Sequence, residues 1–111
     1  MAVYVDNARN PYGRMLMCHM VADRIEELFG MADRIGIAHR HFQPGSFPHF
    51  DLSLTYRGRA IRSGAIEVDR HDLVRVMRAY RDLIRTDPEE MALLRIRHQP
   101  LQILRDRGPA S

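Results

Sequence analysis

The 111-residue sequence predicts an α/β domain with a short, mostly parallel sheet in two or three layers, built in the order β-α-β-α-β-α and followed by C-terminal helices. Two observations support this class. Short apolar runs alternate along the chain with longer amphipathic stretches, which is the pattern of βαβ units. Turn-forming residues and helix caps separate these stretches. We expect residues 1–85 to form a single α/β domain and residues 86–111 to form a C-terminal helical extension, because this length leaves no room for a second domain.

The first strand and the first helix are separated by a long loop. A strand is predicted over residues 2–5, and a loop over residues 6–14, where Asn, Pro and Gly favour turns. Apolar residues recur at spacings of three and four over residues 21–35, which predicts a helix. Gly36 follows at the position where a left-handed residue commonly ends a helix.

Two further predicted strands flank the second helix. An extended segment over residues 37–43 leads into a loop over residues 44–48 that contains two prolines and a glycine. Ser53 stands where it would cap a helix over residues 54–63. The β-branched and apolar residues 65–68 predict a short third strand.

Two helices complete the predicted chain. Asp69 stands before a helix over residues 70–85, whose apolar side chains share one face. The last helix starts near Pro88, because proline suits a first turn and the acids after it complement the helix dipole, and it is interrupted at Pro100. Its apolar residues need a partner surface, which is either the same chain or a second subunit. We expect a homodimer that forms through the C-terminal helices.

The composition argues against a membrane-spanning, secreted or disulfide-bonded protein. No apolar run approaches the roughly 20 residues of a membrane-crossing helix, and the N-terminus lacks the basic and apolar segments of a secretory signal. The single cysteine, Cys18, cannot form an internal disulfide. We therefore expect a cytoplasmic protein with a reduced thiol and no membrane partner.

The cationic residues are all arginine, 17 in number, and the formal net charge is +3. Arginine binds phosphates and carboxylates through two parallel hydrogen bonds, which is compatible with a nucleotide or nucleic-acid partner. The arginines are interspersed with acids and form no dense basic block, so biased codon use in a GC-rich genome also explains them. In the helix over residues 70–85, Asp72 and Asp82 interrupt the arginines, and we interpret that surface as a solvated face.

Acidic and imidazole side chains stand at the ends of predicted strands. Asp6 follows the first strand, His19 follows Cys18, and His49 and Asp51 follow the loop with two prolines. Because open α/β domains build their sites at strand ends, Asp6, His19, His49 and Asp51 are the candidate catalytic residues. Histidine transfers protons near neutral pH. A structural hydrogen bond to a backbone carbonyl is the simpler explanation for either histidine taken alone.

Cys18 and His19 are expected to have different roles. Adjacent residues of a strand point to opposite faces, so an extended segment here would send only one of them to the site. We predict that His19 is functional and that Cys18 belongs to the core. A nucleophilic Cys18 would need an imidazole, such as that of His49, to lower its pKa.

Two arginines are candidate ligand-binding residues. Arg14 lies in the predicted loop after the first strand, and Arg57 lies near the start of the predicted second helix. Both would donate hydrogen bonds to a phosphate or another anion.

Several short motifs occur together in this sequence. They are Val-Tyr-Val-Asp at 3–6, Met-Cys-His-Met-Val-Ala-Asp at 17–23, Phe-Gln at 42–43, His-Phe-Asp at 49–51 and Gly-Ala-Ile-Glu-Val at 64–68. Their combination resembles a small bacterial and phage family that is known only as a domain of unknown function. The resemblance covers roughly residues 2–80 and implies no activity.

A looser resemblance concerns nucleases. An acid after the first strand, a later Asp51, and Gly-Ala before another strand are similar to PIN-like metal-dependent nucleases, in which acids hold Mg²⁺ or Mn²⁺. The resemblance implies Asp6 and Asp51 as metal ligands, with Asp69 or Glu67 as further candidates. Carboxylates suit such hard ions, which can orient a water against a phosphodiester. Strand-end aspartates are also common helix caps.

Two hypotheses of function follow from the sequence. In the first, the domain binds a phosphate-bearing ligand, either a nucleotide or a nucleic-acid end, and acts as a metal-dependent phosphoesterase or nuclease. In the second, the domain is a non-catalytic module that sequesters a nucleotide or binds another protein.

Overall fold

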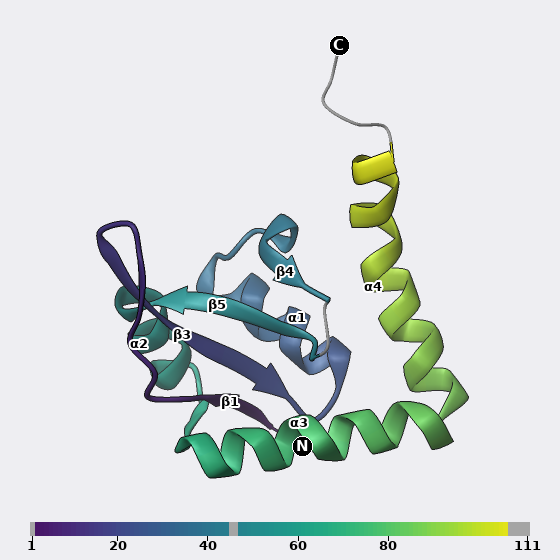
Figure 1. Cartoon of the computed structure of the whole chain (residues 1–111), viewed down its shortest axis with the longest axis horizontal. Helices are drawn as coiled ribbons and strands as arrows, with labels where there is room; N and C mark the ends of the chain where they lie inside the picture. Colours follow the sequence, from purple (N-terminus) through teal and green to yellow (C-terminus); the bar gives the residue numbers. More distant parts are fainter. Residues whose placement is uncertain (1, 45–46, 107–111) are drawn as a thin grey trace.

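One mixed sheet forms the centre of the protein. The computed structural model describes residues 2–44 and 47–106, and within this part the sheet has the strand order β4-β5-β3-β1-β6, with β2 paired to β3 (Figure 1). The strands are β1 (Val3–Val5), β2 (Asn10–Tyr12), β3 (Met15–Ala22), β4 (Phe42–Gln43), β5 (His49–Ser53) and β6 (Ile66–Glu67). The helices are α1 (Ile25–Ile35), the short 3₁₀ helix η1 (His39–His41), α2 (Leu54–Arg62), α3 (Arg70–Thr86) and α4 (Pro88–Asp106).

The predicted α/β class is confirmed, but the expectation of a mostly parallel sheet is wrong. Only β1 and β6 run parallel, whereas β3 is antiparallel to β1, β2 and β5, and β4 is antiparallel to β5. The difference arises from β3, the longest strand, and from β5, neither of which the prediction included. Without β3, the strand order along the chain looked like a series of βαβ units.

Strands β2 and β3 form a hairpin. Its first strand lies in the segment predicted as a loop (residues 6–14), and the end of β3 lies in the segment predicted as a helix (residues 21–35). Asn10–Tyr12 pairs with the start of β3, and Gly13 in the intervening turn has φ 59°, the left-handed region that glycine adopts without strain. Val21 and Ala22 end β3, so α1 begins four residues later than predicted, at Ile25. Apolar residues continue without a break from the strand into the helix, and periodicity alone therefore did not separate them.

Two other boundaries also differ from the predictions. The extended segment over residues 37–43 contains η1, and only Phe42 and Gln43 pair as a strand. Helix α4 does not stop at Pro100 but continues to Asp106. A proline removes one backbone hydrogen bond, and good helix formers on both sides of it can sustain the helix.

Three predicted helix caps, at Ser53, Asp69 and Gly36, are confirmed. The Ser53 hydroxyl accepts a hydrogen bond from the Tyr56 amide at the start of α2, and an Asp69 carboxylate oxygen accepts one from the Asp72 amide at the start of α3. Gly36 ends α1 with φ 85°. These local signals were sufficient to position three of the helix boundaries.

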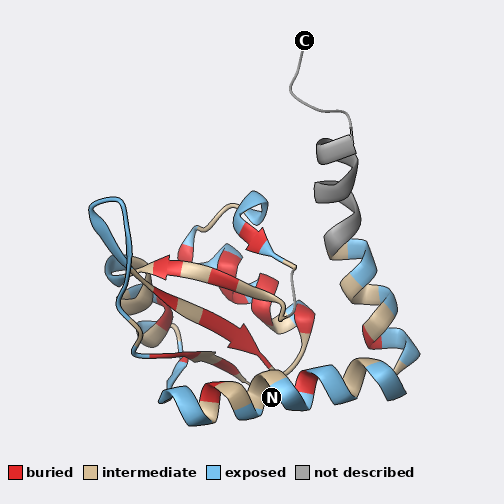
Figure 2. Ribbon diagram, in the orientation of Figure 1, coloured by how far each residue is buried: buried red, intermediate tan, exposed pale blue. Residues whose placement is uncertain are grey.

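One face of the sheet forms the core. Cross-strand partners Val5 and Met20, and Cys18 and Leu52, are fully or almost fully buried on this face. Helices α1 and α2 cover it, behind the sheet in Figure 1, and the buried residues lie between these helices and the strands (Figure 2). The alternation along β3 therefore sends Cys18 inward and His19 to the other face.

The opposite face is only partly covered. Helix α3 packs on its β1 side through Val76, Met77 and Tyr80, which meet Val21 with a residual space of only about 10 Å³. Beyond α3, strands β3 and β5 leave part of this face uncovered. This part carries His19, Asp51 and neighbouring polar residues. The candidate site lies on this open part.

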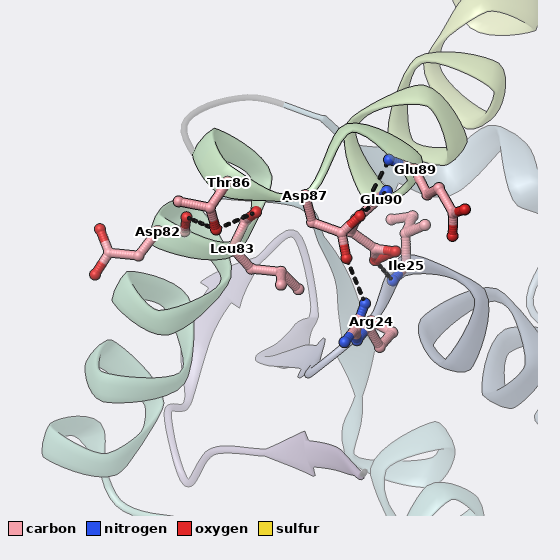
Figure 3. A network of polar contacts seen from close by, with 8 residues as sticks. All are labelled: Arg24, Ile25, Asp82, Leu83, Thr86, Asp87, Glu89 and Glu90. Carbon is pink, nitrogen blue, oxygen red and sulfur yellow. Dashed lines mark hydrogen bonds and ion pairs between the residues drawn. The ribbon is translucent and has the colours of Figure 1, made fainter.

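Hydrogen bonds and ion pairs hold the start of α4 against the N-terminal end of α1 in the same chain. The buried Glu90 carboxylate accepts a hydrogen bond from the Ile25 amide at 2.7 Å, and Asp87 pairs with Arg24 at 3.1 Å (Figure 3). Arg97 donates two hydrogen bonds to the Glu26 carboxylate. Residues 88–97 are thus an integral part of the fold. None of the described helices combines the length and the apolar character needed to cross a membrane.

Candidate functional site

Three of the predicted site residues lie in a row across the centre of the sheet. His19 on β3 is the register partner of Asp51 on β5. On its other side, the Asp6 amide donates a hydrogen bond to the His19 carbonyl and extends the β1–β3 ladder by one residue. Because cross-strand partners point to the same face, the three side chains stand together on the open face.

Asp6 and His19 form a tightly bonded pair, which we call the dyad. One Asp6 carboxylate oxygen accepts from the His19 amide and the other lies 2.8 Å from His19 Nδ1. The Asp6 side chain is 5% exposed and that of His19 is 32% exposed. The carboxylate therefore fixes the imidazole ring, and His19 Nε2 has no hydrogen-bond partner in the described part of the chain.

The two members of the dyad shift each other's pKa. Burial disfavours the charged form of Asp6, but the hydrogen bonds from His19 outweigh this effect and lower the pKa of Asp6 below its ordinary value. The hydrogen bond to Asp6 raises the pKa of His19, and this outweighs the opposing effect of burial. The pair consequently favours a carboxylate beside a protonated imidazole.

His49 lies beside this row, two residues before Asp51 on β5. Its Nδ1 lies 2.8 Å from the Phe47 carbonyl and its Nε2 lies 3.3 Å from an Asp51 carboxylate oxygen. The ring centroids of His19 and His49 are 5.6 Å apart. The structure thus brings together all four predicted catalytic residues. The contact with the Phe47 carbonyl is also the kind of structural hydrogen bond that would explain His49 without a catalytic role.

A hollow opens beside the dyad, between the end of β1 and α3. It has a volume of about 460 Å³, which is within the range of small-ligand sites, and we call it the dyad hollow. Its polar lining comes from the segment after β1, the dyad itself and the start of α3, and its apolar wall comes from α3. The lining residues are Asp6, Asn7, Ala8, Asn10, His19, Arg70, Leu73, Val74 and Met77.

A second hollow lies on the other side of His19, over β3 and β5. It has a volume of about 370 Å³ and is bordered by the arm of the β2–β3 hairpin, so we call it the hairpin hollow. The two hollows share Asn10 and His19. The lining residues are Asn10, Pro11, Tyr12, Met15, Met17, His19, His41, Gln43 and Asp51.

Cys18 takes no part in this site. Its side chain is fully buried on the core face, and burial, together with the negative charge of Asp6, raises the pKa of the thiol to about 11. A thiol in this state is a poor nucleophile near neutral pH. The prediction that Cys18 belongs to the core is confirmed.

The two arginines predicted to bind a ligand lie elsewhere. Arg14 is exposed in the turn between β2 and β3. Arg57 on α2 donates to the Asp6 carbonyl at 2.8 Å and to the Glu67 carboxylate at 3.1 Å, so it braces the end of β1 against β6. Neither residue lines the two hollows, and their predicted role in ligand binding stays a prediction.

Arg70 is the cation that the sequence analysis did not single out. It is the first residue of α3 and lines the dyad hollow opposite the Asp6–His19 pair. A signal was present in the sequence, because Arg70 comes three residues after the short strand β6, as Asp6 comes directly after β1. Since β1 and β6 are parallel neighbours, the residues that follow them meet at the same edge of the sheet.

The geometry of the carboxylates does not favour the predicted Mg²⁺ or Mn²⁺ site. Both oxygens of Asp6 accept hydrogen bonds from His19, Asp69 caps α3, and Glu67 pairs with Arg57. Among the residues that the structure describes, no three His, Cys, Asp or Glu side chains converge as metal ligands would. A metal at Asp6 and Asp51 remains a prediction, and we derive no chemical step from it.

Comparison with known proteins identifies a family but no activity. Residues 3–80 match the model of a family described as "Protein of unknown function (DUF4031)". No curated protein and no solved structure is significantly similar to the chain. The matched residues include the dyad, His49, Asp51 and Arg70, so the whole candidate site lies within the family region.

Proposed function

Because the chain belongs to the DUF4031 family, whose description assigns no activity, we propose a function from its own residues: the protein binds a phosphate-bearing ligand, either a nucleotide or a nucleic-acid end, in the dyad hollow. One observation carries this proposal. The Asp6 carboxylate holds His19 in place and favours its protonated form, and Arg70 lines the same hollow.

The hollow offers donors suited to a phosphate. A protonated His19 would donate a hydrogen bond from Nε2, and Arg70 would donate from its guanidinium group. The Asn7 and Asn10 amides line the same space and supply neutral donors. The Asp6 charge would not repel the ligand strongly, because both carboxylate oxygens already accept bonds from His19.

The same arrangement would support hydrolysis of a phosphoester by acid catalysis. A water would attack the phosphorus as the bond to the leaving oxygen breaks, and His19 would donate its proton to that oxygen. The attacking water would lose a proton to the neutral imidazole that remains, and the Asp6 carboxylate would stabilise the ring in its protonated form before and after these transfers. Arg70 would balance the charge of the phosphoryl oxygens. This step uses only side chains that line the dyad hollow.

The raised pKa of His19 also supports the alternative of sequestration. The bond to Asp6 raises the pKa of His19 and so favours the protonated imidazole, which binds an anion and cannot act as a base. In that case the protein would hold a nucleotide without converting it. Binding residues would be the same for both functions, and only turnover would distinguish them.

The test compares two site variants with a matched control. His19→Asn keeps an amide nitrogen near the position of Nδ1, so it preserves the bond to Asp6 but removes Nε2. Arg70→Gln removes the guanidinium, and Arg85→Gln removes an exposed arginine from the far end of the same helix. We expect adenosine and guanosine 5′-phosphates to raise the melting temperature of the wild type and of Arg85→Gln, and to have little effect on the two site variants.

Calorimetric titration would then give the affinities, and we expect a loss of about tenfold or more in each site variant, as for a charge-assisted hydrogen bond. Absence of binding to the wild type, or equal binding by all four proteins, would refute the proposal. Release of phosphate or nucleoside from the bound compound, measured with and without Mg²⁺ and Mn²⁺, would establish hydrolysis. Binding without release would establish sequestration.

A further inference from the structure

A third hollow continues the line of the first two along the surface of α3. It has a volume of about 370 Å³ and is lined by Arg70, His71, Val74, Arg75 and Arg78, so we call it the arginine hollow. It shares Arg70 and Val74 with the dyad hollow. Since the dyad hollow shares Asn10 and His19 with the hairpin hollow, the three hollows adjoin one another, with the dyad hollow in the middle and His19 between it and the hairpin hollow.

The hairpin hollow is suited to a flat, partly polar ring. Tyr12 is 70% exposed and is the register partner of Met15, itself 49% exposed, on an arm that extends beyond the rest of the sheet (Figures 1 and 2). Exposed aromatic and methionine side chains of this kind stack on nucleobases. Gln43 and Asp51 on the same lining offer an amide and a carboxylate to the polar edge of a base.

The arginine hollow is suited to more than one phosphate. Arg70 and Arg78 make no ion pair in the described part of the chain, and Arg75 makes only a 3.5 Å contact with the exposed Asp72. With a rise of about 1.5 Å per residue, Arg70 and Arg78 lie about 12 Å apart along α3. This distance exceeds the ~3.4 Å rise of one nucleotide in a stacked strand, so the row spans several phosphates.

We propose that the ligand is the end of a single-stranded nucleic acid, with its terminal base in the hairpin hollow, the adjoining phosphate between His19 and Arg70, and the following phosphates along Arg75 and Arg78. This inference rests on the proposed phosphate site and names its substrate class. A duplex end does not fit this arrangement, because a base must leave the stack to reach Tyr12. From the sequence alone, the same arginines are expected to form a solvated face.

The experiment measures affinity as a function of ligand length. The probes are an adenosine nucleotide and single-stranded adenylates of two and four residues, each in ribo and deoxy form with a 5′-phosphate. We expect the wild type to bind the tetranucleotide at least about tenfold more tightly than the mononucleotide, with a steeper dependence on salt concentration for the longer ligand, by about 0.7 in log–log slope for each added contact. The ribo and deoxy arms show whether a 2′-hydroxyl contributes.

Matched variants locate the two ends of the ligand. Arg75→Gln and Arg85→Gln each remove an exposed arginine that contacts an aspartate three residues earlier at 3.5 Å, but only Arg75 lines the arginine hollow. We expect Arg75→Gln, and more so Arg75→Gln with Arg78→Gln, to abolish the gain from added length, and Arg85→Gln to retain it. Tyr12→Ser should weaken binding of every probe by about fivefold or more, whereas Leu16→Ser on the same hairpin should not.

The outcomes separate this inference from the proposed function. Equal affinity for one and four nucleotides, with sensitivity to His19→Asn, would overturn the inference and leave a mononucleotide site. A gain with length that Arg85→Gln loses as fully as Arg75→Gln would show general attraction to a basic surface, and would also overturn it. If neither His19→Asn nor Arg70→Gln affects the mononucleotide, the proposed phosphate site itself is wrong.

Discussion

At the scale of single residues, the bond between Asp6 and His19 determines the state of the site. Asp6 comes directly after a strand, and its side chain folds back to accept two hydrogen bonds from the residue opposite it. A buried carboxylate is costly unless it is paired, and here one residue supplies both donors. The imidazole is consequently fixed in orientation, and its protonation is linked to a side chain that barely reaches solvent.

We predict that Asp6→Asn lowers the pKa of His19 towards the ordinary value of 6.5, because the hydrogen bond to Asp6 is the largest cause of the raised pKa. Histidine ring signals followed by NMR across a pH series provide the measurement. Asp51→Asn is the matched control, since the charge of Asp51 has a smaller effect on His19, and its pKa should fall less. An unchanged pKa in Asp6→Asn would contradict this account of the dyad.

The same shifts set the pH range in which the dyad stabilises the fold. The raised pKa of His19 adds stability that is complete below its ordinary value of 6.5 and is lost as the pH rises through its folded-state pKa. The lowered pKa of Asp6 adds stability that is complete above 3.8 and is lost as the pH falls through its folded-state pKa. The difference in unfolding free energy between wild type and Asp6→Asn should therefore be largest between pH 3.8 and 6.5.

At the scale of secondary-structure elements, the N-terminus of α1 depends on α4. Arg24, which precedes α1, makes no side-chain hydrogen bond to the helix, and the Ile25 amide donates instead to Glu90. Glu90 is 2% exposed, and it faces the positive end of the helix dipole. A residue distant in sequence thus performs the capping role that a neighbouring Ser, Thr, Asp or Asn usually has.

We predict that Glu90→Ala destabilises the protein by about 1–3 kcal/mol, because the Ile25 amide would remain buried without an acceptor. Glu90→Gln should cost less, since its amide oxygen can still accept this bond. Urea denaturation provides the measurement, with the exposed Glu89→Ala as control. An equal loss for Glu89→Ala and Glu90→Ala would show that the effect concerns helix charge and not the buried bond.

The sequence predicted elements with local signals and missed those that depend on distant contacts. The caps at Ser53 and Asp69 were predictable because the interaction lies within four residues. Most of strand β3 was not, because its pairing with β1 and β5 involves residues far away in the chain, although its short hairpin with β2 is local and was missed as well. In the candidate site, only Asp6 follows a strand as expected, whereas His19, His49 and Asp51 lie within β3 and β5 and meet Asp6 through strand pairing. Without the β1–β6 pairing, the sequence did not connect Arg70 to them.

At the scale of the whole molecule, α4 belongs to the domain at its start and projects from it farther along (Figure 1). Arg97 links it to Glu26 on α1, and Ile96 in the same turn is 58% exposed. The apolar residues predicted to mediate a homodimer include positions beyond residue 97, which lie outside the described side chains. The homodimer therefore stays a prediction of the sequence.

We predict that removal of residues 98–111 converts a dimer into a folded monomer, because the contacts of Glu90 and Arg97 remain, and that the melting temperature falls only by the part that dimerisation contributes. Light scattering coupled to size-exclusion chromatography measures the mass of both proteins. Removal of residues 88–111 is the contrasting variant and should lower the melting temperature, since it also removes Glu90. A monomeric full-length chain would contradict the predicted dimer.

The bond between Glu90 and the Ile25 amide has a consequence for the order in which the protein is made. The two residues are 65 positions apart, so at translation rates of roughly 5–20 residues per second Ile25 is synthesised about 3–13 s before its acceptor exists. Within that interval the nascent chain gains the last residue of the candidate site, Arg70, before it gains Glu90. The N-terminus of α1, the helix behind the sheet, therefore lacks its hydrogen-bond acceptor until a segment beyond the family region has been synthesised.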